Sequence, residues 1–518
     1  MNRLSIVAFA ACLIPAAAFA LAFSGPNNLA TGERPAGVAV GDFNGDGRTD
    51  IAVATDNLDK IEVFFGAGGG AFSAPTAYLT GAGTGPDALR AADVDGDLDL
   101  DLVFTLHNVN QIGTLINSGG VFALGPTGAT GVNPIGLASG NLNADALPDF
   151  VAVNRDDNSI TVLLNTGGGF AASNVAVGLD PRSVALGDLD GDGDSDAVVS
   201  NHDSRTVSVL FNSAGTLGSQ VTYSVGGNVR PAGVALGDVD GDLDLDILAA
   251  TSGNGLNFVS VLKNTGGVFG APINFNSGGV NPDSLAVADF DQDGDRDVVV
   301  TNQDSNTIGI LVNPGTGTFG AATTMPTGTT PGPIAVGDLN GDSGLDLAVS
   351  NRDSNNLSLF MNESVPVQVN PTAFSFFRGQ QVSGGLSDLL ISDDLKLVGR
   401  NFIVLTPGEA PLQVVFDGSA GAVTPTGLTF TLEASVSTAG LSQTIEMFNW
   451  LTGLYETVDA RSASTADSTV TVTIATNPGR FVSGTGAVRA KVSYKPSGPI
   501  NAGIWQARFD YVHWIIAR

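Results

Sequence analysis

The sequence predicts an all-β protein in which a seven-bladed β-propeller is followed by an antiparallel, jelly-roll-like β-sandwich. Two observations lead to this fold class. An acidic nine-residue motif recurs in seven copies about 50 residues apart, and short β-branched runs bounded by Gly, Asn or Asp turns surround each copy. The repeat stops near residue 365, and the remaining chain alternates apolar and polar residues without the motif.

The composition narrows the function classes. The 518 residues include 52 acidic and 22 basic side chains, for a formal net charge of −30. This balance argues against binding to nucleic acid or to an anionic membrane surface. Hydrophobic residues make up 43% of the chain, so a large core can form. The single cysteine, Cys12, lies in the N-terminal apolar stretch, which excludes disulfides and zinc–thiolate sites from the mature protein.

Residues 1–22 are typical of a secretory signal peptide. Arg3 precedes an almost wholly apolar run over residues 4–21, and small residues at its end offer a cleavage site. An anchoring helix is the alternative, since about 18 apolar residues can just span a bilayer, but Pro15 and the small-residue exit favour cleavage. We therefore expect a secreted, cell-surface or periplasmic protein without a membrane span after cleavage.

The seven motif copies define the repeat. Each copy follows the pattern Asp-x-Asp/Asn-x-Asp-x-x-x-Asp, with a proline seven residues before it and Val, Leu or Ile four residues before it; the third copy is degenerate. The copies begin at Asp42, Asp93, Asn141, Asp188, Asp238, Asp289 and Asp338, and the prolines are Pro35, Pro86, Pro134, Pro181, Pro231, Pro282 and Pro331. Seven copies in phase exclude a compositional accident.

Each repeat can be divided into four short strands. In the fourth repeat the expected strands are residues 184–186, 197–200, 207–211 and 221–224, with the acidic motif between the first two. Four strands in about 50 residues correspond to one propeller blade. A β-solenoid is the rival architecture, but its coils usually take only ~20–30 residues.

The repeat resembles the FG-GAP or VCBS repeat, the calcium-loop blade of integrin-alpha-type β-propellers. The resemblance covers about residues 21–365 and implies seven blades over residues 23–365, each with a calcium loop between its first two strands. Residues 23–26 repeat the sequence type of residues 72–75, where a fourth strand begins, whereas the seventh repeat lacks this element. The N-terminal segment is therefore expected to close the last blade by pairing near residues 357–361.

The motif residues are suited to calcium. Ca²⁺ takes six to eight oxygen ligands, and acids at loop positions 1, 3, 5 and 9 can converge where the backbone turns around the ion. The loops contain no His or Cys for a transition metal, and they hold 28 of the 52 acidic residues. Solvated, unoccupied acidic turns are the alternative. The predicted ligands are Asp42, Asn44, Asp46 and Asp50; Asp93, Asp95, Asp97 and Asp101; Asn141, Asn143, Asp145 and Asp149; Asp188, Asp190, Asp192 and Asp196; Asp238, Asp240, Asp242 and Asp246; Asp289, Asp291, Asp293 and Asp297; and Asp338, Asn340, Asp342 and Asp346.

The loops are not equivalent. Position 6 must turn sharply, and glycine fills it in loops one, four and six, whereas Leu98 and Leu243 fill it in loops two and five. Loop three has only two carboxylates, Asp145 and Asp149. We therefore rank loops one, four and six first, loops two, five and seven next, and loop three last, and expect six or seven Ca²⁺ ions.

A second set of residues follows the second strand of several repeats. These turn residues are expected on the face opposite the calcium loops; they are His107, Arg155, His202, Gln303 and Arg352. Integrin-like propellers engage partners on that face, so the resemblance makes these residues candidates for ligand binding. The alternative is that they are solvated turn residues whose Asn and Asp neighbours satisfy the backbone.

Residues 366–518 are expected to form the β-sandwich. Alternation over residues 468–474 and 488–494 predicts antiparallel strands, and all three tryptophans, Trp450, Trp505 and Trp514, lie here. The tryptophans can fill the core or stack on sugars, and the core is favoured.

The leading functional hypothesis is an exported, calcium-stabilised binding or adhesion module for an extracellular protein or polysaccharide. A polysaccharide lyase or hydrolase on a propeller scaffold is the alternative, with His107, Arg155 and His202 as the only trio of residues for acid–base chemistry. A purely structural envelope protein is a third possibility. Paired acids in the loops do not indicate glycosidase chemistry, because metal binding already explains them.

Overall fold

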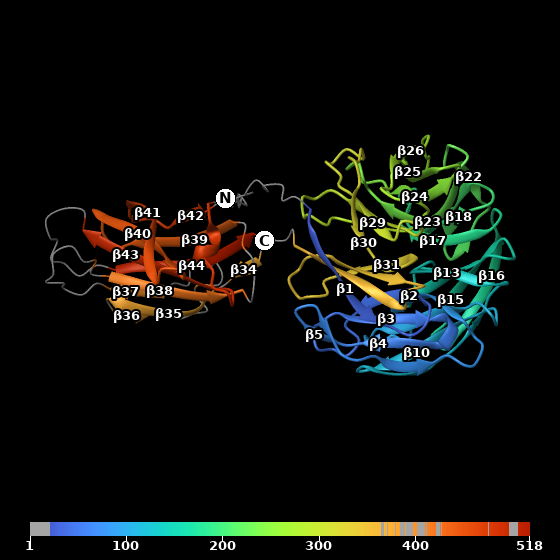
Figure 1. Ribbon diagram of the computed structural model, residues 1–518, viewed down its shortest axis with the longest axis horizontal. Coiled ribbons are helices and arrows are strands. Elements are labelled where there is room, and N and C mark those ends of the chain that lie inside the picture. The colour runs from blue at the N-terminus through green and yellow to red at the C-terminus, as the bar shows by residue number, and fades with distance from the viewer. Residues whose placement is uncertain are drawn as a thin grey trace, which may run out of the picture. The chain divides into compact units, whose positions relative to one another are not determined.

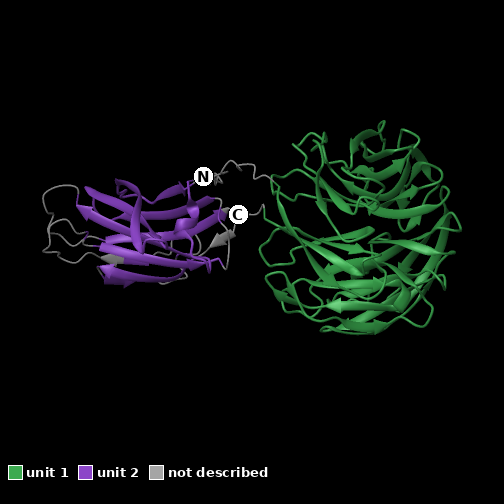
Figure 2. Ribbon diagram, viewed as in Figure 1, with its two compact units in different colours: residues 1–363 green, residues 364–518 purple. Residues whose placement is uncertain are grey.

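The computed structural model describes residues 21–363 and, in the rest of the chain, residues 367–369, 371–378, 380–383, 389, 397–400, 410, 412–420, 425, 427–474, 476–496 and 506–517. The chain divides into two compact units between Glu363 and Ser364 (Figure 2). Apart from Leu21 and Ala22, the predicted signal peptide lies outside the described residues. Within the described ranges, no helix has the length and apolar character needed to cross a membrane.

Residues 21–363 form seven antiparallel sheets of at least four strands each (Figure 1). The innermost strands are β2 (Pro35–Gly41), β8 (Pro86–Ala92), β13 (Pro134–Gly140), β17 (Pro181–Gly187), β23 (Arg230–Gly237), β27 (Pro282–Ala288) and β31 (Pro331–Gly337). The second strands are β3 (Asp50–Thr55), β9 (Asp101–Leu106), β14 (Asp149–Asn154), β18 (Asp196–Asn201), β24 (Asp246–Gly253), β28 (Asp297–Asn302) and β32 (Asp346–Asn351).

Two further strands complete each sheet. The third strands are β4 (Lys60–Phe64), β10 (Gln111–Ser118), β15 (Ser159–Asn165), β19 (Thr206–Leu210), β25 (Leu256–Leu262), β29 (Thr307–Leu311) and β33 (Asn356–Asn362). The outer strands are β7 (Thr76–Leu79), β11 (Val121–Leu124), β16 (Phe170–Ala176), β22 (Val221–Ser224), β26 (Ile273–Asn276), β30 (Thr323–Pro326) and, in the last sheet, β1 (Phe23–Ala30). Short pairs are β5 (Gly66–Gly68) with β6 (Ala71–Phe72) and β20 (Asn212–Ser213) with β21 (Thr216–Leu217), and β12 (Gly128–Ala129) pairs with β10.

The seven sheets close into a ring. Each innermost strand contacts the innermost strands of the sheets before and after it, and β31 of the last sheet contacts β2 of the first. The N-terminal strand β1 is the outer strand of the last sheet, with Phe23 opposite Asn362 and Leu29 opposite Leu357. The two ends of the propeller chain therefore share one sheet, and the outer edge of β33 is paired. The architecture is that of a β-propeller.

Packing between neighbouring sheets explains why the strands are apolar on both faces. In β18, Val198 lies in one hydrophobic cluster with Ile247 of the following sheet, and Val199 lies in another with Val153 of the preceding sheet. Successive side chains of a strand point to opposite faces, so a strand between two neighbours buries both sets. The continuous β-branched runs after each acidic motif are the sequence pattern of such strands.

The strand directions place two kinds of connection on opposite faces. Each innermost strand runs from its proline to the acidic loop, and the second strand returns from that loop. All seven acidic loops therefore lie on one face of the ring, which we call the loop face. The turns after the second strands lie on the other, which we call the turn face.

The second unit is a sandwich of two antiparallel sheets, in agreement with the predicted fold class. One has the strand order β36-β37-β44-β39-β42, with β34 also on β44, and the other has the order β35-β38-β43-β40-β41. The strands are β34 (Val367–Val369), β35 (Pro371–Arg378), β36 (Gln380–Ser383), β37 (Leu397–Arg400), β38 (Leu412–Ser419), β39 (Gly427–Val436), β40 (Leu441–Asn449), β41 (Leu454–Ser462), β42 (Ser468–Ile474), β43 (Ala487–Pro496) and β44 (Gln506–Ala517).

The sandwich core contains rings from both sheets. Phe416 of β38 lies edge-on to Phe509 of β44, with ring centroids 5.5 Å apart. Trp514 is fully buried in this core, as the core interpretation predicts, whereas Trp450 is half-buried and Trp505 lies outside the described residues.

Candidate metal loops and central cavity

The aspartate at position 1 folds most of the acidic loops. In the first loop, Asp42 Oδ1 accepts N–H bonds from Gly45 (2.8 Å) and Asp46 (3.2 Å), and its Oδ2 accepts one from Gly47 (2.8 Å). The same kind of bond is accepted by Asp93, Asp188, Asp238, Asp289 and Asp338. A short carboxylate that accepts bonds from the next few backbone amides holds a tight turn. The first acid of the motif therefore shapes the loop before any cation is considered.

The aspartate at position 9 is fully buried in all seven loops. Asp246 is typical: its Oδ2 accepts the Val239 N–H (3.1 Å) and its Oδ1 accepts the Asn264 N–H (2.8 Å). Burial raises the pKa of these carboxyls, neighbouring loop acids raise it further, and the backbone hydrogen bonds lower it. The resulting pKa is about 6 for Asp196 and Asp246 and about 7 for Asp297 and Asp346. Position 9 thus joins the loop to the end of the third strand of its own sheet.

Four loops bring three carboxylates together. In each, one oxygen from positions 1, 3 and 9 lies within 4.8 Å of the other two. The sets are Asp93, Asp95 and Asp101; Asp188, Asp190 and Asp196; Asp238, Asp240 and Asp246; and Asp289, Asp291 and Asp297. Two oxygens bound to one Ca²⁺ at roughly 2.4 Å can be at most about 4.8 Å apart, so the spacing fits a shared calcium ion.

The position-5 acids do not belong to these four sets. Asp242 Oδ1, for example, accepts the N–H of Asp244 at position 7 (3.0 Å), and the equivalent bond recurs in the other loops. The sequence predicts that positions 1, 3, 5 and 9 converge, whereas the three-carboxylate sets consist of positions 1, 3 and 9. The turn at positions 5–7 holds one oxygen of the position-5 carboxylate against the N–H of position 7.

Loop five contains an orphaned acceptor. Asp240 Oδ2 pairs with the Lys263 ammonium at 3.0 Å, but its Oδ1 is buried without a hydrogen-bond partner among the described residues. A buried carboxylate oxygen without a partner is costly, and a cation among the three acids of this loop would satisfy it. The donor set of oxygen atoms alone, without His or Cys, fits Ca²⁺.

The sharp turn at position 6 does not depend on glycine. Leu98 and Leu243 take left-handed conformations there, with φ of 76° and 77°, close to the 79° of Gly47, and Ser343 follows with 72°. Loops two and five therefore keep the backbone form of loop one and also hold three-carboxylate sets. The ranking by glycine content thus rests on a feature that the loops do not require.

Loop three differs from the other six. Its Asn143 amide donates to the Asp145 carboxylate (2.8 Å), and its Asn141 amide donates to the Asp145 carbonyl. Side-chain N–H groups thus contact oxygens that would otherwise be available to a cation. Ala146 at position 6 is not in the left-handed region that the other loops share at this position. The sequence prediction ranks this loop last, and the hydrogen bonds of its two asparagines distinguish it from the other loops.

Sequence reasoning missed a row of asparagines that connects the sheets on the loop face. Each stands at or just after the end of a third strand and donates its side-chain N–H to a loop carbonyl of the preceding sheet, as Asn264 does to Leu189 O (2.8 Å). The others are Asn117, Asn165, Asn212, Asn313 and Asn362. In the first sheet Gly66 occupies this place. An Asn after an apolar run in six of the seven repeats was the available signal.

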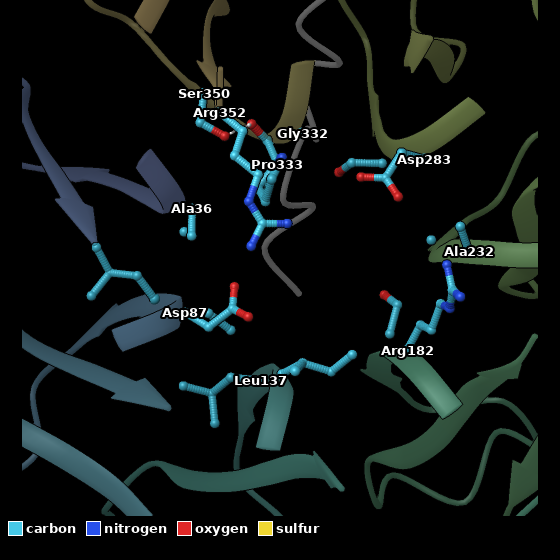
Figure 3. Close-up of a pocket in the computed structure, with 18 of the residues that line it drawn as sticks. Ala36, Asp87, Leu137, Arg182, Ala232, Asp283, Gly332, Pro333, Ser350 and Arg352 are labelled. Carbon is cyan, nitrogen blue, oxygen red and sulfur yellow. Dashed lines mark hydrogen bonds between the residues drawn. The ribbon is translucent and has the colours of Figure 1, made fainter. Parts of the chain in front are cut away.

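On the turn face, a cavity of about 630 Å³ opens between the innermost strands. Four of the five predicted ligand-binding residues line it, namely His107, Arg155, Gln303 and Arg352; His202 is not among the lining residues. Figure 3 shows Asp87 and Arg352 pointing toward one another inside the ring, with Arg182 and Asp283 on another side.

The turn residues are organised by two aspartates that the sequence prediction did not include. Asp56 lies 3.6 Å from Arg352, 3.7 Å from His107 and 3.8 Å from Arg34. Asp180 lies 2.8 Å from Arg155, 3.0 Å from Arg182 and 3.0 Å from His202. Burial opposes ionisation of Asp180, but hydrogen bonds from Arg182 and Arg155 lower its pKa overall. The predicted trio is therefore divided, with His107 at one aspartate and Arg155 and His202 at the other.

The chain was compared with curated proteins and with solved structures, and the similar structures have low sequence identity. No curated protein is similar enough in sequence to match the chain. Similar solved structures include BBS1N in its complex with ARL6DN, soaked with lead (TM-score 0.49, 14% identity, 66% of this chain and 97% of that chain). Hydrazine synthase of Kuenenia stuttgartiensis has a TM-score of 0.46 at 14% identity, covering 64% and 96%. A protein from Lactobacillus plantarum has a TM-score of 0.43 at 14% identity, covering 57% and 86%.

The model of the FG-GAP-like repeat matches residues 42–104, 141–199, 188–249, 238–300 and 289–349. Each matched segment begins at position 1 of an acidic loop and ends near the close of a second strand, so the match follows the loop-and-strand unit described above. These segments together span more than half of the chain. The chain therefore belongs to the FG-GAP-like repeat family.

Proposed function

We propose that the protein is an exported, calcium-stabilised propeller that acts as a binding or adhesion module for an extracellular protein or polysaccharide. The propeller is a scaffold of the kind used for binding or structural roles, and the finer function rests on the two faces of the ring. The loop face supports the calcium part of the proposal, the turn face supports the binding part, and the N-terminal apolar segment supports export to the cell surface, periplasm or medium.

The observation that carries the proposal is the set of three carboxylates in loops two, four, five and six, each within the spacing of one ion. Loops one and seven have Asn44 and Asn340 at position 3, whose amide oxygens can replace a carboxylate as ligands. In loop three, side-chain amide N–H groups bond to Asp145, so we do not assign a calcium ion to this loop. The proposal is therefore six calcium ions per chain.

Calcium in these loops would link the first two strands of each sheet. Positions 1 and 3 follow the innermost strand, and position 9 begins the second strand. An ion held by all three neutralises carboxylates that otherwise repel one another. Binding to the folded state alone then raises the free energy of unfolding by mass action.

A thermal unfolding experiment tests the calcium part. The account predicts that chelator lowers the unfolding temperature sharply, that added calcium restores it, and that magnesium restores it poorly. An unfolding temperature that does not respond to chelator would refute calcium stabilisation. Screening glycan and protein arrays in calcium and in chelator tests the binding part; a partner bound equally well by the chelated protein would separate binding from calcium.

A further inference from the structure

One residue breaks the repeat inside the central cavity. The fourth residue after the repeat proline is alanine in six repeats: Ala39, Ala138, Ala185, Ala235, Ala286 and Ala335. In the second repeat this position is Arg90. The six alanines are not among the residues that line the cavity, whereas the Arg90 side chain is exposed within it. A single guanidinium therefore projects from a position that the fold otherwise fills with a methyl group.

Every guanidinium of the cavity except that of Arg90 lies near a carboxylate of the described residues. Arg34 and Arg352 lie near Asp56, and Arg155 and Arg182 pair with Asp180. Two further carboxylates, Asp87 and Asp283, face the same guanidiniums: Arg352 lowers the pKa of Asp87, and Arg182 and Arg352 lower that of Asp283, although burial raises both overall. Four of the five guanidiniums that line the cavity thus have carboxylate neighbours, one of which, Asp180, lies outside the lining, and Arg90 is the fifth guanidinium.

Arg90 has no carboxylate partner among the described residues. Its one hydrogen bond runs from Nη1 to the Leu89 carbonyl of its own strand (2.8 Å), which leaves most of its five N–H donors directed elsewhere. The side chain is exposed to the cavity, and desolvation by the protein around the cavity lowers its pKa. A guanidinium with unused N–H donors and no carboxylate partner can receive an anion that enters the cavity.

The remaining lining favours a ligand with hydroxyl groups. Asp87 and Asp283 are acceptors, Gln303 and Ser284 are neutral polar groups, and His107 Nδ1 is buried without a partner in the described structure. Each innermost strand has a sheet neighbour on one side only, so backbone N–H and C=O groups on its other edge add donors and acceptors. The cavity of about 630 Å³ lies within the ~300–1,000 Å³ range of small-molecule sites.

We propose that the central cavity binds a hexuronate, a sugar with one carboxylate, whose carboxylate is received by Arg90 and whose hydroxyls meet the acceptors of the innermost strands. This inference rests on the proposed binding function and gives it a ligand class. A guanidinium accepts a carboxylate through two parallel hydrogen bonds, which a neutral sugar cannot form.

The test is titration calorimetry of the full chain in calcium with D-galacturonate and D-glucuronate. D-galactose, acetate and inorganic phosphate serve as comparison ligands. At least one hexuronate is expected to bind at least tenfold more tightly than all three. Equal binding of acetate or phosphate would overturn sugar recognition, and no measurable hexuronate binding would overturn the proposal.

Arg90→Ala is the decisive variant, because alanine is the residue that the other six repeats carry at this position, so the fold accommodates it. It should weaken hexuronate binding at least tenfold, and Arg90→Lys should weaken it less. Arg205→Ala is the matched control, since Arg205 is exposed and its guanidinium bonds Asn228 away from the cavity lining. Unchanged affinity in Arg90→Ala would overturn the assignment. An unfolding temperature insensitive to chelator would instead refute the calcium proposal and leave the hexuronate result standing.

Discussion

The two faces of the propeller are built from the same repeats, but residue types recur on the loop face and vary on the turn face. On the loop face, the N–H at position 6 donates to the position-1 Oδ2 in six of the seven loops, and the same residue types recur at the same positions. On the turn face, equivalent positions hold Asp56, His107, Arg155, His202 and Arg352, so the ring is chemically uneven. Repetition on one face indicates a property that every sheet needs, and variation on the other indicates a site that the ring needs only once.

The first prediction removes a position-9 carboxylate from the loop face. Asp246→Ala leaves the Val239 and Asn264 N–H groups buried without acceptors. Each unsatisfied N–H lowers the free energy of unfolding by about 1–3 kcal/mol. We expect a loss of roughly 2–6 kcal/mol in the free energy of unfolding, measured by urea denaturation. Asp246→Asn keeps the shape and one acceptor oxygen and should lose less. Equal stability of Asp246→Ala and the parent protein would contradict the anchoring role.

The second prediction separates calcium binding from loop folding. Asp190 at position 3 of loop four is exposed, and no hydrogen bond holds its carboxylate in the described structure. Asp190→Ala should therefore lose about 1.4 kcal/mol of stability at calcium ten times above the dissociation constant, and little in chelator. Asn143→Ala in loop three is the matched control and should show no calcium-dependent loss. A loss of the same size in chelator would mean that Asp190 acts through the fold and not through calcium.

The third prediction concerns pH. The raised pKa values of Asp297 and Asp346, about 7, lie above the ordinary value of 3.8, so the metal-free folded state binds protons that the unfolded state does not between these limits. The stability of the chelated protein should therefore rise as pH falls from about 7.5 to 5. Calcium requires ionised ligands, so its contribution should shrink over the same range. Unfolding temperatures with and without calcium should converge at pH 5; a gap that widens toward acid would refute this coupling.

The fourth prediction is the smallest effect and concerns the turn face. Arg90→Ala should change the free energy of unfolding by no more than about 0.5 kcal/mol, because Arg90 makes one hydrogen bond to its own strand and no ion pair within the described residues. Thermal and urea unfolding of this variant, beside Asp246→Ala, measure the contrast between the faces directly. A loss as large as that of Asp246→Ala would make Arg90 a structural residue.

The fold could be predicted because its determinants are local and repeated. The acidic motif, the proline before it and the β-branched runs each recur in every repeat, and strand β42 spans the same residues, 468–474, that the alternation predicts. The left-handed turns at Leu98 and Leu243 could not be predicted, since the position-1 carboxylate imposes a conformation that leucine alone would avoid. Residue type at one position was outweighed by the hydrogen bonds of the whole loop.

The candidate sites were predictable only in part, because they depend on contacts between repeats. The bond from Asn264 to Leu189 joins residues 75 apart, and Asp180 contacts two guanidiniums and one imidazole from two sheets. Neither relation follows from one repeat considered alone. The break at Arg90, by contrast, is visible in the aligned repeats, although its significance depends on knowing that the position borders a cavity.

The most direct test of the account is a count of bound calcium. Elemental analysis of the purified chain, dialysed against calcium-containing buffer and then freed of unbound ions, should give six Ca²⁺ per chain. Asp190→Ala should give five, and Asn143→Ala should remain at six. A chain without bound calcium, or one whose calcium content is the same in Asp190→Ala, would contradict the claim that the repeated loops are calcium sites.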